Sequence, residues 1–313
     1  MNKIKDIEEF CKLYKINIPL KEEFDYYIST LLKSPEYNYS DLEKKINDFV
    51  QLEKYAEANN FVSVSKLKMY CLDTLADYIK ATSAYVALQE KELPKKQLNT
   101  KDWTSTVESD DLLMSIDFIS ANYSVLKTFD SAGELKESWR ELCESLLIPE
   151  ALIESKSFRQ IVYGNTSPKR LQTFQHGHIM TITEELKKSG HILENNLIFV
   201  SHDEFIVKID PSCEYVVSKI LSLKQEVEDI ISVHVINMPI HHRVFKLEKI
   251  GKNKYIKNNF DILDDSLCLK HKSLMGIPSN LFFKYFKQYI INEEIEDRDL
   301  YFKIENRLAR WVI

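Results

Sequence analysis

The sequence is poor in the features that mark special classes of chain. Its 313 residues include only six glycines and eight prolines, so we expect few flexible linkers. No apolar run approaches the roughly 20 residues that a membrane-spanning helix needs. The charged first ten residues also lack the apolar stretch of a signal peptide. The composition therefore predicts an ordinary soluble, cytoplasmic protein with no membrane partner.

Cysteine pairs and phosphate-binding loops are missing as well. The five cysteines are odd in number, and no two are spaced as in a CxxC motif. This pattern is typical of reduced thiols in a protein core and argues against a disulfide framework or a zinc site. Neither a GxxxxGK[ST] nor a GxGxxG loop is present, so nothing indicates a P-loop or a dinucleotide-binding turn.

Basic residues are fewer than acidic ones. The 42 Lys and Arg residues against 48 Asp and Glu residues give a formal net charge of −6. Such a chain has no global basic surface, so any binding of nucleic acid needs a local basic groove. The 44% hydrophobic content is nevertheless enough for a sizeable core, in two domains or in one domain with appendages.

Helical patterns fill the first part of the chain. Apolar residues recur at helical spacing over 4–14, 42–52 and 64–88. The polar residues 89–110 follow and contain one proline, which is typical of a boundary. We therefore expect an all-helical N-terminal domain at residues 1–100.

Strands and helices alternate after this boundary. The short apolar run Leu112–Phe118 predicts a buried strand, and the runs 197–200 and 205–209 predict a hairpin. The remaining patterns predict helices at 122–129, 134–147, 154–164, 168–188, 214–230 and 280–291, a strand at 231–238, and a second hairpin over 243–259. Together these elements predict an α+β fold.

The turn of the first hairpin holds the most informative residues. Its residues are Ser201, His202, Asp203 and Glu204. A turn rich in carboxylates, without Gly or Pro, is not what turn geometry alone favours. We therefore interpret Asp203 and Glu204 as a candidate cation site, with a solvated turn as the alternative. Asp117 lies near the end of the strand at 112–118, where a buried lone carboxylate is costly unless it is paired or binds a metal.

The helix at 154–164 adds positive charge. Lys156, Arg159 and Tyr163 recur at steps of three and four, so we expect them to share one face. The opposite face is expected to carry Phe158, Ile161 and Val162. Acids on two strands, cations and an aromatic ring are the groups that nucleotidyl transfer through two Mg²⁺ ions requires. A solvated helix face and an aromatic residue at the rim of the core are the alternatives.

Three segments also resemble known motifs. SIDFISANYSVL resembles motif A of family A DNA polymerases and single-subunit phage-type RNA polymerases, KSFRQIVYG resembles their motif B, and SHDEF resembles their motif C. The resemblance covers residues 110–240, with motifs and elements in the same order. It implies a polymerase-type palm with an antiparallel sheet at 101–260 and short helical fingers inserted at about 130–190. Residues 1–100 would then be thumb-like, and residues 261–313 a C-terminal helical and basic extension.

The resemblance also assigns catalytic roles. It implies that Asp117 and Asp203 are catalytic and bind both Mg²⁺ ions, with the Phe118 carbonyl as a further ligand. Glu204 would support the primer end or the metal site. Only 86 positions separate Asp117 from Asp203, much fewer than in those families, so the fingers would be abbreviated.

The implied nucleotide-binding residues are Asn122, Lys156, Arg159 and Tyr163. Lys156 or Arg159 would hold the triphosphate, and Tyr163 would close on the new base pair. Lys156 precedes Tyr163 by seven positions, whereas family A has eight. Asn122 stands where family A has the glutamate that selects the sugar, so the choice between deoxyribose and ribose stays open.

The expected function is therefore template-directed nucleotide addition, with a nucleic-acid template and primer, nucleoside triphosphates and two Mg²⁺ ions. The His-Asp-Glu turn favours DNA synthesis. An RNA polymerase, or one subunit of a split phage-type RNA polymerase with a second subunit as partner, is the alternative. A non-catalytic nucleic-acid-binding or assembly protein with a degenerate palm is an alternative of another class. By analogy, so reduced an enzyme would suit a virus or phage acting in the host cytoplasm.

Overall fold

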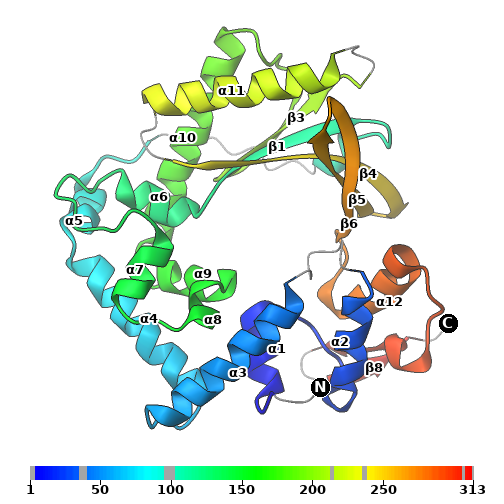
Figure 1. Cartoon of the computed structure of the whole chain (residues 1–313). Coiled ribbons are helices and arrows are strands. Elements are labelled where there is room, and N and C mark those ends of the chain that lie inside the picture. The colour runs from blue at the N-terminus through cyan, green and yellow to red at the C-terminus, as the bar shows by residue number, and fades with distance from the viewer. Residues whose placement is uncertain are drawn as a thin grey trace.

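The structure, a computed structural model, describes residues 4–34, 41–94, 103–211, 215–234, 238–304 and 307–311. These residues form a mixed α+β fold with a six-stranded antiparallel sheet and a separate two-stranded one. The ribbon bends into a ring, with the large sheet on one side and helices around most of the rest (Figure 1). None of the described helices combines the length and the apolar character needed to span a bilayer.

The N-terminal part is helical, as predicted. Its helices are α1 (Ile7–Tyr14), α2 (Phe24–Leu32), α3 (Leu42–Ala58), α4 (Val64–Ala81) and α5 (Ser83–Glu90). The pattern over 64–88 is split into two helices because Thr82 is extended, with φ −74° and ψ 146°. Its hydroxyl accepts a hydrogen bond from the Tyr85 N–H and so caps α5.

The large sheet has the strand order β2-β3-β1-β4-β5-β6. Its strands are β1 (Leu112–Phe118), β2 (Leu197–Val200), β3 (Glu204–Ile209), β4 (Ile240–Gly251), β5 (Lys254–Leu263) and β6 (Ser266–Met275). The predicted buried strand β1 is central, and both predicted hairpins, β2–β3 and β4–β5, are present. The last strand, β6, was not predicted and extends the sheet beyond residue 260.

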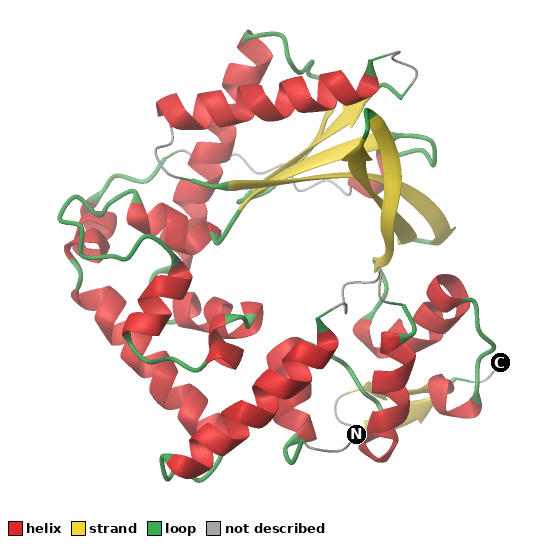
Figure 2. Cartoon of the chain, viewed as in Figure 1, coloured by secondary structure: helices red, strands yellow, loops and turns green. Residues whose placement is uncertain are grey.

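The two faces of the sheet differ, because side chains alternate along each strand. Met114 and Val207 belong to the large core, to which α10 (Pro168–Lys188) and α11 (Val216–His234) also contribute (Figure 2). The opposite face carries Ser115 and Asp117 at the end of β1. Its only apolar patch among the described residues is a small cluster around Leu113. One face is thus packed, and the other presents polar side chains.

Two predicted elements between and after the strands were wrong in type or extent. The strand predicted at 231–238 is wrong for residues 231–234, which belong to α11, where Val227, Ile230 and Ile231 are buried at helical spacing; residues 235–237 lie outside the described part. The helix predicted at 134–147 is only α7 (Trp139–Ser145), capped by Ser138. The other helices of this region are α6 (Ala121–Lys127), α8 (Glu150–Ile153) and α9 (Lys156–Gly164).

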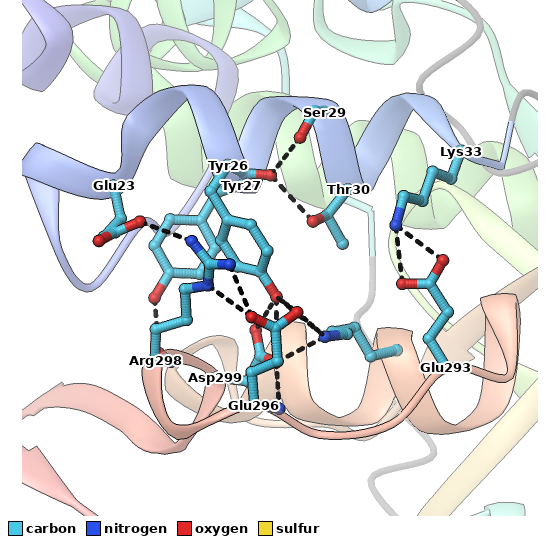
Figure 3. A network of polar contacts seen from close by, with 11 residues as sticks. Glu23, Tyr26, Tyr27, Ser29, Thr30, Lys33, Glu293, Glu296, Arg298 and Asp299 are labelled. Carbon is cyan, nitrogen blue, oxygen red and sulfur yellow. Dashed lines mark hydrogen bonds and ion pairs between the residues drawn. The ribbon is translucent and has the colours of Figure 1, made fainter.

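The C-terminal segment packs on α2 through a set of polar side chains that we name the clasp: Tyr26, Lys287, Glu296 and Asp299. The Tyr26 hydroxyl donates to Asp299 Oδ1 at 2.9 Å (Figure 3). Lys287 Nζ donates to Asp299 Oδ2 at 2.9 Å, to Glu296 at 3.0 Å and to the Tyr26 hydroxyl at 2.9 Å. The side chains of Lys287 and Asp299 are 1% and 0% exposed.

The clasp joins segments more than 250 positions apart. It lies beside the helical segment predicted at 280–291, which begins with α12 (Phe282–Phe286) and continues as a π-helical turn over Lys287–Ile291. The small sheet of β7 (Tyr301–Ile304) and β8 (Arg307–Arg310) follows. The clasp therefore fastens the first helices of the chain to its last elements.

Candidate functional site

The pairing of β1 with β3 brings two of the predicted residues together. The strands are antiparallel, and Asp117 lies opposite Glu204. One residue further along, the Phe118 N–H donates to the Asp203 carbonyl at 2.9 Å. Asp117 and Glu204, and likewise Phe118 and Asp203, are thus backbone neighbours at one end of the sheet although they are far apart in the chain.

Ser201 shapes the turn that carries Asp203. The Ser201 N–H donates to the Glu204 carbonyl at 2.7 Å, and its hydroxyl accepts from the Glu204 N–H at 3.1 Å. These bonds close the turn without a glycine. Asp203 itself is exposed at the tip, so its carboxylate is accessible to a ligand.

Helix α10 supports both acidic elements from behind. The ring of His176, which is fully buried, donates from Nδ1 to the Ser201 carbonyl at 3.0 Å. The adjacent Gln175 donates from Nε2 to Asn122 Oδ1 at 2.8 Å, at the start of α6. The sequence analysis assigned no role to Gln175 or His176. Both lie on the buried side of α10, with Leu171, Phe174 and Ile179, and polar residues at the spacing of that apolar side are the signal that could have found them.

The two carboxylates on the polar face have unequal surroundings. Asp117 Oδ2 lies 3.3 Å from Arg243 Nη2, whereas Asp117 Oδ1 is buried and has no hydrogen-bond partner among the residues that the structure describes. Burial raises the pKa of Glu204, and the nearby charge of Asp117 adds to this effect, while a hydrogen bond to Ser115 opposes it. Asp117 and Glu204 therefore lie together with only one ion pair, to Arg243, to offset their negative charge.

Two cations lie on the same face of the sheet, and the sequence analysis predicted neither. Arg243 of β4 is opposite Ser115, and Lys257 of β5 is opposite Leu247. The Lys257 ammonium lies 3.8 Å from the centroid of the Phe245 ring. Burial, followed by the charge of Arg243, lowers the pKa of Lys257 to about 8.

These acids fit the magnesium ions that the resemblance implies. A buried carboxylate oxygen without a partner is costly, and a cation at Asp117 Oδ1 would remove that cost. Mg²⁺ commonly takes only one or two protein carboxylates and completes its shell with water and substrate phosphates. In the described part of the chain no three His, Cys, Asp or Glu side chains form a metal-binding group, so substrate and water would have to supply the other ligands. Phe118 stays a predicted ligand.

The predicted cationic helix lies apart from the acids. Helix α9, with Lys156 and Arg159, is across the ring from β1 and β3 (Figure 1). Lys156 is exposed and Arg159 is half-buried. The structure therefore divides the predicted residues into one group at the sheet, including Asn122, and a second group on α9.

Tyr163 is not on the face where the sequence analysis put it. Its side chain is only 1% exposed and packs on Trp139, with ring centroids 5.7 Å apart, whereas Ile161 is 41% exposed. The buried side of α9 is formed by Phe158, Val162 and Tyr163, so it is rotated away from Ile161 relative to the predicted apolar face, and Trp139 of α7 packs on Tyr163. In this conformation Tyr163 cannot stack on a base.

This end of the sheet is thus a candidate active site: Asp117 and Glu204 share the polar face with Arg243 and Lys257, Asp203 lies at the adjoining turn, and α10 supports that turn. Asp117 and Asp203 are close because of strand pairing, and α10 fixes the turn between β2 and β3. The chain matches no known protein-family model and no curated protein.

Proposed function

We propose that this protein is a template-directed nucleotidyltransferase, a small nucleic-acid polymerase that uses two Mg²⁺ ions. One observation carries the proposal: antiparallel pairing places Asp117 and Asp203 at one end of a central strand pair. Carboxylates on rigid neighbouring strands are what a pair of metal ions requires for in-line attack on a phosphate. Helices cover one face of the large sheet, and substrate can approach the opposite, polar face.

The mechanism follows from the residues at the sheet. Asp117 and Asp203 would hold the Mg²⁺ ions, which activate the attacking hydroxyl and stabilise the pyrophosphate. Arg243 and Lys257 place positive charge on the same face, where it can offset charge that develops on the phosphates. Glu204 would orient the primer end beside Asp117.

The residues on α9 would act from the opposite side. Lys156 or Arg159 would hold the triphosphate once α9 and the sheet approach each other, a closure of the kind that many enzymes make on substrate binding. Asn122, with its amide oriented by Gln175, would face the sugar of the incoming nucleotide. DNA synthesis is the favoured product because of the His-Asp-Glu turn. RNA synthesis, alone or with a second subunit, is the alternative.

Primer extension with Mg²⁺ and separate dNTP and NTP pools tests the proposal. We expect incorporation by the wild type from one pool and a loss of about 10³-fold or more in Asp117→Asn and Asp203→Asn, since removal of a metal ligand costs several kcal/mol of transition-state stabilisation. Asp261→Asn, which changes a carboxylate on β5 that pairs with Lys270, is the matched control and should retain activity. Equal incorporation by all four proteins would contradict the proposed roles.

A binding or assembly protein with a degenerate palm is the second candidate. The burial of Tyr163 favours it, because a polymerase needs an aromatic side chain near the base. Oligonucleotide binding without incorporation from either pool, with or without candidate partner subunits, would support this function over the first.

A further inference from the structure

A groove on the N-terminal part is lined by more basic than acidic side chains, although the chain as a whole has a negative net charge. It has a volume of about 660 Å³ and lies along α1, the following residues 15–21 and Ser279. Its charged lining residues are Glu8, Lys12, Lys15 and Lys21. Three cations and one acid give this basic groove an excess of two positive charges, in a protein whose net charge is −6.

The single carboxylate is shared between two of the lysines. Glu8 Oε1 lies 2.8 Å from Lys12 Nζ, and Glu8 Oε2 lies 2.6 Å from Lys21 Nζ. These hydrogen bonds lower the pKa of Glu8 to about 2. Both ion pairs are largely exposed, so a phosphate can replace the carboxylate at little cost.

The third lysine connects the groove with α9. Lys15 Nζ donates to Gln160 Oε1 at 2.7 Å, and this acceptor is neutral. Lys156 and Arg159 lie on the same short helix as Gln160. Cations from α1 and from α9, about 145 positions apart in the chain, therefore lie on adjoining elements across the ring from the acidic site.

The composition of the groove indicates what it holds. Ile7, Ile16 and Ile18 line it beside the lysines. Apolar surface flanked by several cations suits a strand that alternates sugars with phosphates. We propose that the basic groove binds the sugar–phosphate backbone of a nucleic-acid strand. The use of this binding during nucleotide addition rests on the proposed polymerase function.

Fluorescence anisotropy with a labelled single-stranded oligonucleotide, in EDTA and over a series of salt concentrations, tests this binding directly. We expect the triple variant Lys12→Gln/Lys15→Gln/Lys21→Gln to bind at least about tenfold more weakly. The slope of log affinity against log salt should fall by about 2, because three phosphate contacts are lost at roughly 0.7 each. The control triple variant Lys54→Gln/Lys66→Gln/Lys80→Gln removes the same charge from exposed positions of α3 and α4 and should bind like the wild type.

A gain of affinity excludes misfolding as the explanation. Glu8→Gln removes the only acid of the basic groove, so it should bind the oligonucleotide several-fold more tightly. Equal losses in the two triple variants, no gain in Glu8→Gln, or competition by polyglutamate as effective as by unlabelled oligonucleotide would each overturn the inference. The assay contains no metal or nucleotide. Failure here with normal primer extension therefore rejects the groove alone, and normal binding without any extension rejects the polymerase function.

Discussion

Two lysines that are largely removed from solvent show how differently this protein compensates such a charge. Lys287 in the clasp is almost completely buried, and burial alone would lower its pKa; hydrogen bonds to Tyr26, Asp299 and Glu296 nevertheless raise it. Lys257 on the sheet has no such side-chain hydrogen bonds to the residues that the structure describes, and burial lowers its pKa to about 8. The clasp therefore compensates its charges, whereas the acidic site does so only in part, through the pair of Asp117 with Arg243.

This difference separates a structural cluster from a candidate functional one. A compensated network stabilises one conformation, whereas titratable groups shifted by burial and by neighbouring charges are concentrated at functional sites. Lys257 and Glu204, whose pKa values are shifted by burial, are of the second kind. If the contrast is correct, substitutions in the clasp should affect stability, and substitutions at the acidic site should affect activity.

The largest stability effect is expected in the clasp. Lys287→Met leaves Asp299 buried without its cation, so we expect the free energy of unfolding in urea to fall by about 3–5 kcal/mol. Lys33→Met is the matched control, because the pair Lys33–Glu293 joins the same two segments but is exposed. It should cost less than about 1 kcal/mol.

A double substitution sharpens this prediction. Lys287→Met/Asp299→Leu removes both charges, so much of the stability lost in the single variant should return. A double variant no more stable than Lys287→Met would show that packing, and not the unpaired charge, explains the loss.

The second effect concerns Lys257 and depends on pH. Between pH 8 and 10.5 the unfolded chain retains a proton that the folded protein has released, so wild-type stability should rise with pH across this window. Lys257→Met removes the cost of the buried charge. The variant should be more stable than the wild type by about 2 kcal/mol at pH 7, with the advantage disappearing near pH 10.5.

Urea unfolding at pH 7 and pH 10, with a chelator present, measures this difference. Lys249→Met, at an exposed position of the adjacent strand β4, is the control. An advantage of Lys257→Met that stays constant between the two pH values would contradict a lowered pKa and indicate a packing effect.

A smaller gain is expected from Tyr163→Phe. The Tyr163 hydroxyl is buried and has no hydrogen-bond partner in the described structure, so its removal should stabilise the protein by about 1 kcal/mol. Tyr123→Phe is the control, since that hydroxyl donates to the Lys136 carbonyl at 2.7 Å and its loss should destabilise. A drop in nucleotide incorporation for Tyr163→Phe would show that the side chain leaves its buried position.

The smallest change in stability is expected for Asp117→Asn, although this variant should lose most of its activity. Asp117→Asn removes only the partly exposed pair with Arg243, so unfolding should change by less than about 1 kcal/mol. Asp111, next to the other end of β1, is 8% exposed at its side chain and pairs with Lys208 at 2.6 Å. Asp111→Asn should therefore destabilise more than Asp117→Asn. The reverse order would contradict the assignment of Asp117 to function.

Local patterns predicted the elements that carry the acids. The apolar run at 112–118 and the two runs around the turn at 201–204 gave the positions of β1, β2 and β3, because strand burial and turn chemistry are local properties. Helix α10 was predicted with the bounds it has, since a proline begins it and a polar segment follows it.

Long-range contacts account for what the sequence could not show. Arg243 and Lys257 reach the site only through the register of β4 and β5, and nothing in their own segments indicates that register. Tyr163 is buried because Trp139 of α7 packs on its side of α9, which helical spacing alone cannot reveal. The clasp likewise depends on side chains that no local pattern brings together.

The clasp also has a consequence for how the chain matures on the ribosome. Tyr26 is translated early, yet its acceptor Asp299 is 273 positions further along. Helix α2 therefore cannot acquire its buried polar partners until residues 287–299 have been synthesised. A chain stalled before residue 287 would leave the aromatic side of this helix uncovered and open to chaperones.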